Sequence, residues 1–347
     1  MSTVGVPSGI EDVTSSWLSE ALGERVDDVH AEQIAQDSGF SSLLYRVQLT
    51  GDRVPETVIV KLAAQSEARG AMDMLGGYRR ELAFYQKVAS RGPLATPHVY
   101  VARMAQDSVD FVLVMEDLRD WENADHLAGL TMRRVEVCIA QLAGLHAWSI
   151  TEGDVPEDFP SIDTPIARDV FLPVFALGWQ VYLRHAVVPV PPAVARYAAR
   201  FAELAPQALD ALSERSMLLH GDIRADNMFF DGDRLKVVDF QFAAHGVGVA
   251  DIGYLVSQGL PTEVRQGHDE ALVRQYLERL REHGVDDYGF EEAWRHYRFA
   301  VAYLMVLPVI TLVGWDAMPE RSRALCIKLV ERAVATVHET NALEVFG

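Results

Sequence analysis

Two short polar segments constrain this chain more than any other feature of its sequence. One runs through residues 220–227 (His-Gly-Asp-Ile-Arg-Ala-Asp-Asn) and the other through residues 239–241 (Asp-Phe-Gln). Each follows an apolar run that is typical of a short buried strand, so both segments are predicted to be loops at strand ends. Such a fold brings the carboxylates of Asp222 and Asp239 and the amide of Asn227 to neighbouring loops.

This set of side chains suits magnesium-dependent phosphoryl transfer. The reaction needs a carboxylate that accepts the hydroxyl proton, and further oxygen ligands that hold Mg²⁺ against the nucleotide phosphates. The first segment fits H-x-D-x-x-x-x-N, and the second supplies Asp-Phe after an apolar strand, as in the kinase motifs. We therefore expect Asp222 to be the catalytic base and Asn227 and Asp239 to be the magnesium ligands. His220 is expected to order the loop by hydrogen bonds, and Asp226 to lie in a solvated turn.

A lysine and a glutamate upstream complete the expected nucleotide site. Lys61 follows the β-branched run of residues 57–60, and a lysine in a buried strand needs an acidic partner. Glu81, on the next predicted helix, is the natural partner, although each residue alone is equally compatible with a surface charge. Ser41 and Ser42 end a turn with one glycine, where hydroxyl and backbone groups can contact phosphate; an ordinary hairpin turn is the alternative.

The order of the predicted elements indicates an α+β chain with two lobes. Strand patterns with one inserted helix fill residues 29–118, and helical spacing dominates after residue 125. We expect an N-terminal nucleotide-binding lobe over residues 1–115, a hinge at 116–120 and a catalytic and acceptor-binding lobe over 121–347. A cleft between two such lobes is a preferred ligand site.

Composition excludes several other classes of function. Of 347 residues, 49% are hydrophobic, and 50 acidic against 31 basic residues give a net charge of −19. This charge opposes a general affinity for nucleic acid or anionic membrane. Two distant cysteines and a start without a basic and apolar leader pattern favour a reducing cytoplasm. The apolar residues 299–315 are predicted to be a buried helix, and no membrane role is expected.

The motifs together resemble the aminoglycoside phosphotransferase, choline kinase and ecdysteroid kinase-like superfamily of protein-kinase-like folds, and the Asp-Phe-Gln variant resembles the ecdysteroid kinase-like branch most. The resemblance covers most of the chain and implies a bilobal fold with an antiparallel N-terminal sheet and a larger helical lobe. It also implies ATP as the donor, with backbone groups of Glu116 and Leu118 at the adenine edge. By the same resemblance, Asp251 braces the catalytic loop and Arg224 neutralises the transferred phosphoryl group. Gln241 departs from the usual glycine, so no switching of that loop is assumed, and the glycine-poor phosphate turn leaves GTP open.

The acceptor and two rival readings stay open at this point. An aminoglycoside pocket needs clustered carboxylates, for which residues 157–158, Asp163 and Asp169 are candidates, whereas apolar segments in the helical half favour a neutral or hydrophobic alcohol. The rivals are a silent nucleotide-binding pseudokinase, which is expected to lack Asp222, Asp239 or Lys61, and a metal-dependent phosphoester hydrolase, which normally needs more histidines. Oligomeric state is not readable from the sequence.

Overall fold

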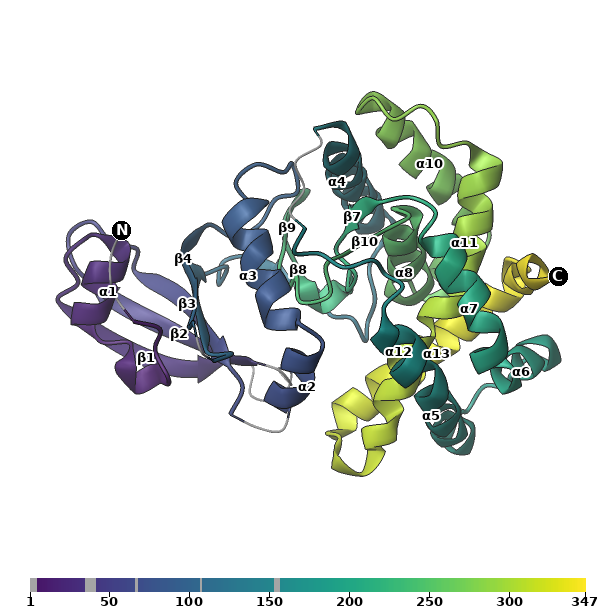
Figure 1. Cartoon of the computed structure of the whole chain (residues 1–347), viewed down its shortest axis with the longest axis horizontal. Coiled ribbons are helices and arrows are strands. Elements are labelled where there is room, and N and C mark those ends of the chain that lie inside the picture. Colours follow the sequence, from purple (N-terminus) through teal and green to yellow (C-terminus); the bar gives the residue numbers. More distant parts are fainter. Residues whose placement is uncertain (1–4, 35–41, 66–67, 107, 153–156) are drawn as a thin grey trace. The chain divides into compact units, whose positions relative to one another are not determined.

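The computed structural model describes residues 5–34, 42–65, 68–106, 108–152 and 157–347. It divides into two compact units (Figure 1). Unit 1 comprises residues 1–91, 96–121 and 238–242, and unit 2 comprises residues 92–95, 122–237 and 243–347. The predicted hinge, residues 116–120, lies inside unit 1.

Unit 1 is built on an antiparallel sheet with strand order β1-β2-β3-β5-β4, as predicted for the N-terminal half. The strands are β1 (Asp28–Ile34), β2 (Ser42–Thr50), β3 (Thr57–Ala63), β4 (Val99–Met104) and β5 (Phe111–Glu116). The helices are α1 (Ser15–Leu22), α2 (Ala68–Met74) and α3 (Gly77–Lys87), after a short 3₁₀ turn, η1 (Ile10–Asp12). The main helix inserted between the strands is α3, which packs against β4.

The local sequence explains these elements. Thr14 begins α1 as its N-cap, because its hydroxyl accepts the amide of Trp17. The valines of β3 alternate with other residues, so Val58 and Val60 point into a core with Val114 of β5, and all three are fully buried. Lys61 interrupts this apolar run, and the reason lies in the site described below.

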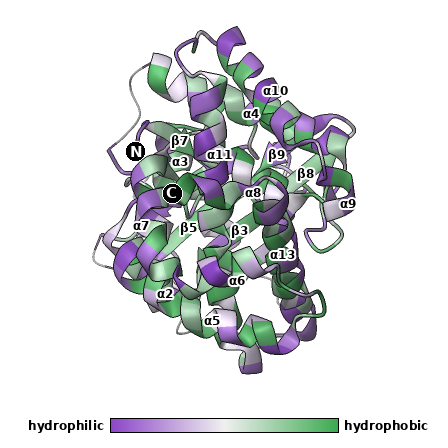
Figure 2. Ribbon diagram, turned by 90° about the vertical axis from the view of Figure 1, so that its right-hand side faces the viewer, coloured by the Kyte–Doolittle hydropathy of each residue, from purple (hydrophilic) through white to green (hydrophobic). Residues whose placement is uncertain are grey.

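Unit 2 is mainly helical. Its long helices are α4 (Met132–Thr151), α5 (Leu172–His185), α6 (Pro192–Ala199), α7 (Phe201–Leu212), α8 (Val249–Gly259), α10 (Asp269–Glu282), α11 (Phe290–Leu304) and α13 (Glu320–Glu339). The shorter helical segments are η2 (Ala167–Phe171), η3 (Ala225–Asn227), α9 (Thr262–Arg265), α12 (Val306–Thr311), η4 (Leu312–Ala317) and η5 (Ala342–Phe346). In α10 the buried residues recur at helical spacing, and Figure 2 shows hydrophilic and hydrophobic residues alternating along it.

Two small antiparallel sheets in unit 2 carry the first polar segment. One pairs β7 (Met217–Leu219) with β10 (Ala244–Gly246), and the other has the order β6-β8-β9. Their remaining strands are β6 (Glu122–Asn123), β8 (Met228–Asp231) and β9 (Arg234–Val237). The loop of residues 220–227 therefore leaves the end of β7 and enters β8.

The apolar segment 299–315, predicted to be one buried helix, is interrupted in the structure. Helix α11 ends at Leu304, and α12 begins two residues later. Pro308 accounts for this break, because a proline ring clashes with the carbonyl four residues earlier, which is that of Leu304. The stretch Phe290–Ala317 is long and apolar enough to cross a membrane, but 61% of its most apolar window is buried inside the protein. Its α11 part packs against α8, α7 and α13, as a core helix of unit 2.

Candidate active site

Lys61 of β3 is the centre of an ion triad in unit 1, in which Lys61 and Glu81 are buried and the Asp239 side chain is 29% exposed. Its Nζ atom lies 2.7 Å from Oε1 of Glu81 on α3 and 3.5 Å from Oδ1 of Asp239. Burial alone would lower the pKa of the Lys61 ammonium, but the carboxylates of Asp239 and Glu81 raise it above its usual value. Lys61 is therefore a fixed positive charge, and the predicted pairing with Glu81 is present.

Gln241 extends this triad on the other side of Glu81. Its side-chain amide nitrogen donates to Oε2 of Glu81 at 3.1 Å and to Oγ of Ser42 at 3.2 Å. The two oxygens of Glu81 are thus held by different donors, and Gln241 is itself buried. Ser42 begins β2 and lies in this network, whereas Ser41 lies outside the described residues. The residue that departs from the kinase motif therefore has a definite structural role.

The backbone at Asp239 is strained. Asp239 has a φ of 70°, and the only other non-glycine residue with positive φ among those described is Asn341. Such a conformation costs free energy and is retained where surrounding contacts fix it, which occurs most often at functional sites. Phe240 supplies one such contact, because its ring stacks on Phe84 of α3 at 3.5 Å between centroids.

The loop after β7 is turned by Gly221 and fixed by its own histidine. Gly221 has a φ of 80°, which a side chain would disfavour, and it lets the chain reverse before Asp222. Nδ1 of His220 accepts the backbone amide of Asp222 at 3.2 Å, and His220 is fully buried. The prediction that His220 orders the loop by hydrogen bonds is confirmed.

Asp251 of α8 binds the start of this loop. Its carboxylate accepts the backbone amides of His220 at 2.7 Å and Gly221 at 3.0 Å. Oδ2 also lies 3.2 Å from Nε2 of His146, whose Nδ1 lies 2.9 Å from the Tyr276 hydroxyl. Burial would raise the pKa of Asp251, but the hydrogen bond and charge of His146 help to bring it below its usual value. Asp251 is a buried anion that braces the loop rather than a cap of its own helix.

Three side chains surround Asp222. Nε of Arg224 lies 3.3 Å from its Oδ2, and Nδ2 of Asn227 donates to its carbonyl oxygen at 2.9 Å and to Oδ2 at 3.3 Å. The hydroxyl of Tyr254 on α8 forms a hydrogen bond with the Asp222 side chain, which contributes, after burial, to a pKa of Tyr254 well above its usual value. The Asp222 carboxylate is thus held by donors on several sides.

The segment predicted to face adenine is fixed inside unit 1. Asp117 accepts a bidentate pair of hydrogen bonds from Arg46, with Nε at 2.8 Å and Nη2 at 3.2 Å. The amide of Glu116 donates to the carbonyl of His98, and the carbonyl of Leu118 accepts the amide of Trp121. Backbone groups of Glu116 and Leu118 thus form hydrogen bonds within unit 1. Their contact with the adenine edge stays a prediction.

The two predicted magnesium ligands fit a hard cation. The amide nitrogen of Asn227 is used by Asp222, which orients its amide oxygen, the atom that can bind Mg²⁺. Asp239 supplies a carboxylate next to the fixed positive charge of Lys61. Within the described residues, no group of three or more histidine, cysteine or acidic side chains is arranged to hold a metal ion.

Two of the candidate acceptor carboxylates, Asp163 and Asp169, line one cavity of about 350 Å³ together with Arg168. Asp163 accepts two hydrogen bonds of 2.7 Å from Arg168, which also binds Asp210. Asp169 is exposed. The apolar candidates Phe175 and Trp179 are buried in the core of unit 2. The sequence could not separate these possibilities, because pairing and burial are tertiary properties.

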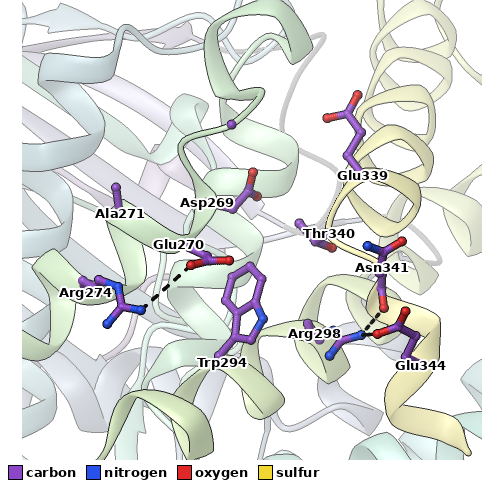
Figure 3. A pocket seen from close by; sticks show the side chains of 11 residues that line it. Asp269, Glu270, Ala271, Arg274, Trp294, Arg298, Glu339, Thr340, Asn341 and Glu344 are labelled. Atoms are coloured by element: carbon purple, nitrogen blue, oxygen red, sulfur yellow. Dashed lines mark hydrogen bonds and ion pairs between the residues drawn. The ribbon is translucent and has the colours of Figure 1, made fainter.

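A second cavity, of about 560 Å³, contains none of the predicted site residues (Figure 3). It lies between α10, α11 and the end of α13, where Trp294 separates Glu270 from Arg298. Its charged groups are paired: Arg298 binds Glu344, Arg274 lies 3.9 Å from Glu270, and Asp269 and Glu339 bind Arg265, which lies outside the lining. Nothing in its lining points to the chemistry of the catalytic loop.

Several residues of the site were not found from the sequence. Asp226, expected in a solvated turn, lies half-buried in the 3₁₀ turn η3, and its Oδ1 also accepts the backbone amide of His126 at 3.0 Å. The sequence did not point to His126 or Arg332. His126 is buried next to the catalytic loop, and Arg332 is buried next to the segment that contains His126. His126 lies shortly after the end of β6, and no sequence motif marks a buried histidine at such a position.

Comparison with known proteins gives one family. The model of the ecdysteroid kinase-like family matches residues 36–286. No curated protein matches the chain.

Solved structures show the same fold. An ethanolamine kinase from Plasmodium vivax is 12% identical with a TM-score of 0.54, over 97% of this chain and 90% of that one. A choline kinase from Cryptosporidium parvum is 11% identical with a TM-score of 0.52, over 91% and 88%. The GDP complex of an aminoglycoside 2′-phosphotransferase-IIIa is 17% identical with a TM-score of 0.52, over 90% and 93%. The predicted α+β, protein-kinase-like fold is confirmed.

Proposed function

The chain belongs to the ecdysteroid kinase-like family, and we propose that it transfers the γ-phosphoryl group of ATP to a hydroxyl group of a small molecule. The proposal rests above all on the ion triad of Lys61, Glu81 and Asp239. A lysine is placed in a hydrophobic strand at a cost in desolvation, and this cost is offset only by paired carboxylates. Such a fixed cation next to a magnesium-binding carboxylate is what a nucleotide triphosphate requires.

The chemistry follows from the residues around Asp222. The acceptor oxygen forms a bond to the γ-phosphorus, the bond from that phosphorus to the bridging oxygen breaks, and the nucleoside diphosphate leaves. Asp222 takes the hydroxyl proton, and Arg224 stabilises the negative charge of the transferred group. Asn227 and Asp239 would hold Mg²⁺, which, when bound, neutralises the charge that develops on the phosphates.

The donor end of the reaction is assigned to unit 1. Lys61 would contact the phosphates, with Glu81 holding the lysine in place. Backbone groups of Glu116 and Leu118 would bind the adenine edge, and the Arg46–Asp117 pair keeps that backbone in position. ATP is the proposed donor. GTP is tested beside it, because a structurally similar aminoglycoside phosphotransferase was solved with GDP.

The proposed acceptor is a neutral or hydrophobic alcohol. A polycationic acceptor needs unpaired carboxylates, and Asp163 is already neutralised by Arg168. This pairing is the observation that favours the neutral class over an aminoglycoside-like one. An aminoglycoside stays in the test as the comparison compound.

The experiment is a screen of hydroxyl-bearing metabolites and antibiotics for phosphorylated product by mass, with Mg²⁺ and ATP or GTP. Asp222→Ala is expected to abolish product while nucleotide binding persists, and Asp239→Ala is expected to weaken binding of the magnesium nucleotide. Nucleotide binding without product across a broad panel would favour a pseudokinase. Release of phosphate from phosphoesters without any nucleotide would favour a hydrolase.

A further inference from the structure

Residues 123–128, which begin with the last residue of β6 in unit 2, hold the far side of the catalytic loop. Nδ2 of Asn123 donates to the carbonyl of Asp226 at 2.9 Å and to that of Met228 at 3.1 Å. The backbone amide of His126 donates to Oδ1 of Asp226 at 3.0 Å, and Nδ1 of His126 accepts the amide of Ala225 at 3.1 Å. Two reciprocal hydrogen bonds therefore join one histidine to two successive loop residues.

The His126 ring has a defined protonation state. Nδ1 must lack a proton in order to accept the amide of Ala225, so the neutral ring carries its proton on Nε2. Burial first, and then the nearby charges of Arg224 and Arg332, lower the pKa of His126 well below its usual value. His126 is 1% exposed, and its Nε2 atom has no hydrogen-bond partner within the described residues. The ring is thus a neutral acceptor held at one place.

Arg332 of α13 fixes the segment from behind. Nη1 donates to the carbonyls of His126 and Gln258, each at 3.0 Å, and Nη2 donates to those of Leu127 at 2.9 Å and Ala128 at 3.2 Å. Arg332 is 4% exposed, and its hydrogen bonds go to backbone carbonyls. A buried guanidinium costs desolvation energy, so a pure packing role would be served better by an apolar residue.

We propose that His126 and Arg332 are positioning residues that set the catalytic loop for turnover, and this inference rests on the proposed function. Ala225 and Asp226 form the short 3₁₀ turn η3 with Asn227, whose amide holds Asp222. A shift of His126 therefore moves the metal ligand and the base together. Displacement of reacting groups by about 1 Å can cost about 100-fold in rate. Neither residue belongs to unit 1, where the nucleotide contacts are assigned.

Two matched substitutions of His126 test the proposal. His126→Asn keeps an acceptor near the position of Nδ1, whereas His126→Gln places its amide nearer to Nε2. We expect His126→Asn to keep kcat within about threefold of wild type, and His126→Gln to lower kcat by about 10- to 100-fold with KM for the nucleotide within about twofold. Equal kcat in the two variants, or a loss carried by KM, would overturn the proposal.

Two further measurements do not depend on activity. In protein labelled with ¹⁵N-histidine, the NMR spectrum of the full chain should show His126 protonated on Nε2 only. Amide hydrogen exchange in the peptide of residues 220–228 should accelerate in His126→Gln and in Arg332→Met, but not in His126→Asn. Unchanged amide exchange in His126→Gln and in Arg332→Met would refute the positioning role of His126 and Arg332, even if a hydroxyl acceptor is found. Failure to find any acceptor, with the expected exchange pattern, would refute the proposed function alone.

Discussion

The side-chain amide of Gln241 donates a hydrogen bond of 3.1 Å to Oε2 of Glu81, the carboxylate oxygen that does not face Lys61. The same amide reaches Oγ of Ser42, so the segment after Asp239 is tied to both α3 and β2. A glycine at this position, as in the usual kinase motif, has no side chain to make these contacts. The structure therefore gives the segment a fixed attachment to the ion triad.

Gln241→Leu removes this donor while keeping the side-chain volume. The buried Oε2 of Glu81 then loses a partner, which costs about 1–3 kcal/mol. We expect the free energy of unfolding in urea to fall by that amount. Nucleotide affinity should fall as well, because Lys61 is then held less firmly. An unchanged urea midpoint would show that Gln241 contributes no structural support to the triad.

Lys61→Met leaves the Glu81 carboxylate buried without its cation. Breaking one partner of a buried ion pair costs about 3–5 kcal/mol, and pairing this change with Glu81→Gln should return part of the loss. The double variant should nevertheless stay unable to bind the magnesium nucleotide tightly. Thermal unfolding and isothermal titration of all three variants separate the two effects. Additive losses in the double variant would contradict a coupled pair.

Asp251→Asn replaces the anion under the catalytic loop by an amide. Asp251 faces two backbone donors, from His220 and Gly221, and an amide nitrogen cannot accept either of them. We expect a loss of about 2–4 kcal/mol in unfolding free energy, and a lower kcat with KM for the nucleotide within about twofold. A loss of kcat without a change in the free energy of unfolding would contradict a structural role of Asp251 in holding the catalytic loop.

Stability should fall as the pH drops below neutrality. Burial lowers the pKa of His126 and of His296, so the folded protein keeps both rings neutral where the unfolded chain binds protons. Their contribution is complete above the unfolded pKa of about 6.5 and decreases as pH falls toward the folded values. The expected slope is about 1.4 kcal/mol per pH unit for each histidine. Urea unfolding of wild type and His126→Asn between pH 7.5 and pH 5 checks this, and equal slopes would contradict it.

The sequence was sufficient to predict the fold class and the residues that belong to recognisable motifs. Lys61 stands out because a lysine ends a β-branched run, and the H-x-D-x-x-x-x-N spacing identifies Asp222 and Asn227 as one set. The partner of Lys61 could be inferred from the next helix, since buried lysines need an acidic partner.

The remaining contacts depend on tertiary structure. His126 and Arg332 lie about 100 residues from the loop they support, and a single sequence has no signal that links them. Asp226 lies in a sequence typical of a solvated turn. Only the tertiary structure brings the His126 amide to the Asp226 carboxylate. The pairing of Asp163 with Arg168 is likewise known only from the structure.

The most direct test of the account is mass detection of a phosphorylated small-molecule alcohol, made from ATP and Mg²⁺ by wild type and by Asp222→Asn. Asp222→Asn keeps the shape of the side chain but cannot accept a proton as the carboxylate does. We expect the mass gain of one phosphoryl group with wild type, and loss of that product in the variant with nucleotide affinity within about twofold. Undiminished product in Asp222→Asn, or phosphoester cleavage by wild type without nucleotide, would contradict the assignment of Asp222 as the base of a small-molecule kinase.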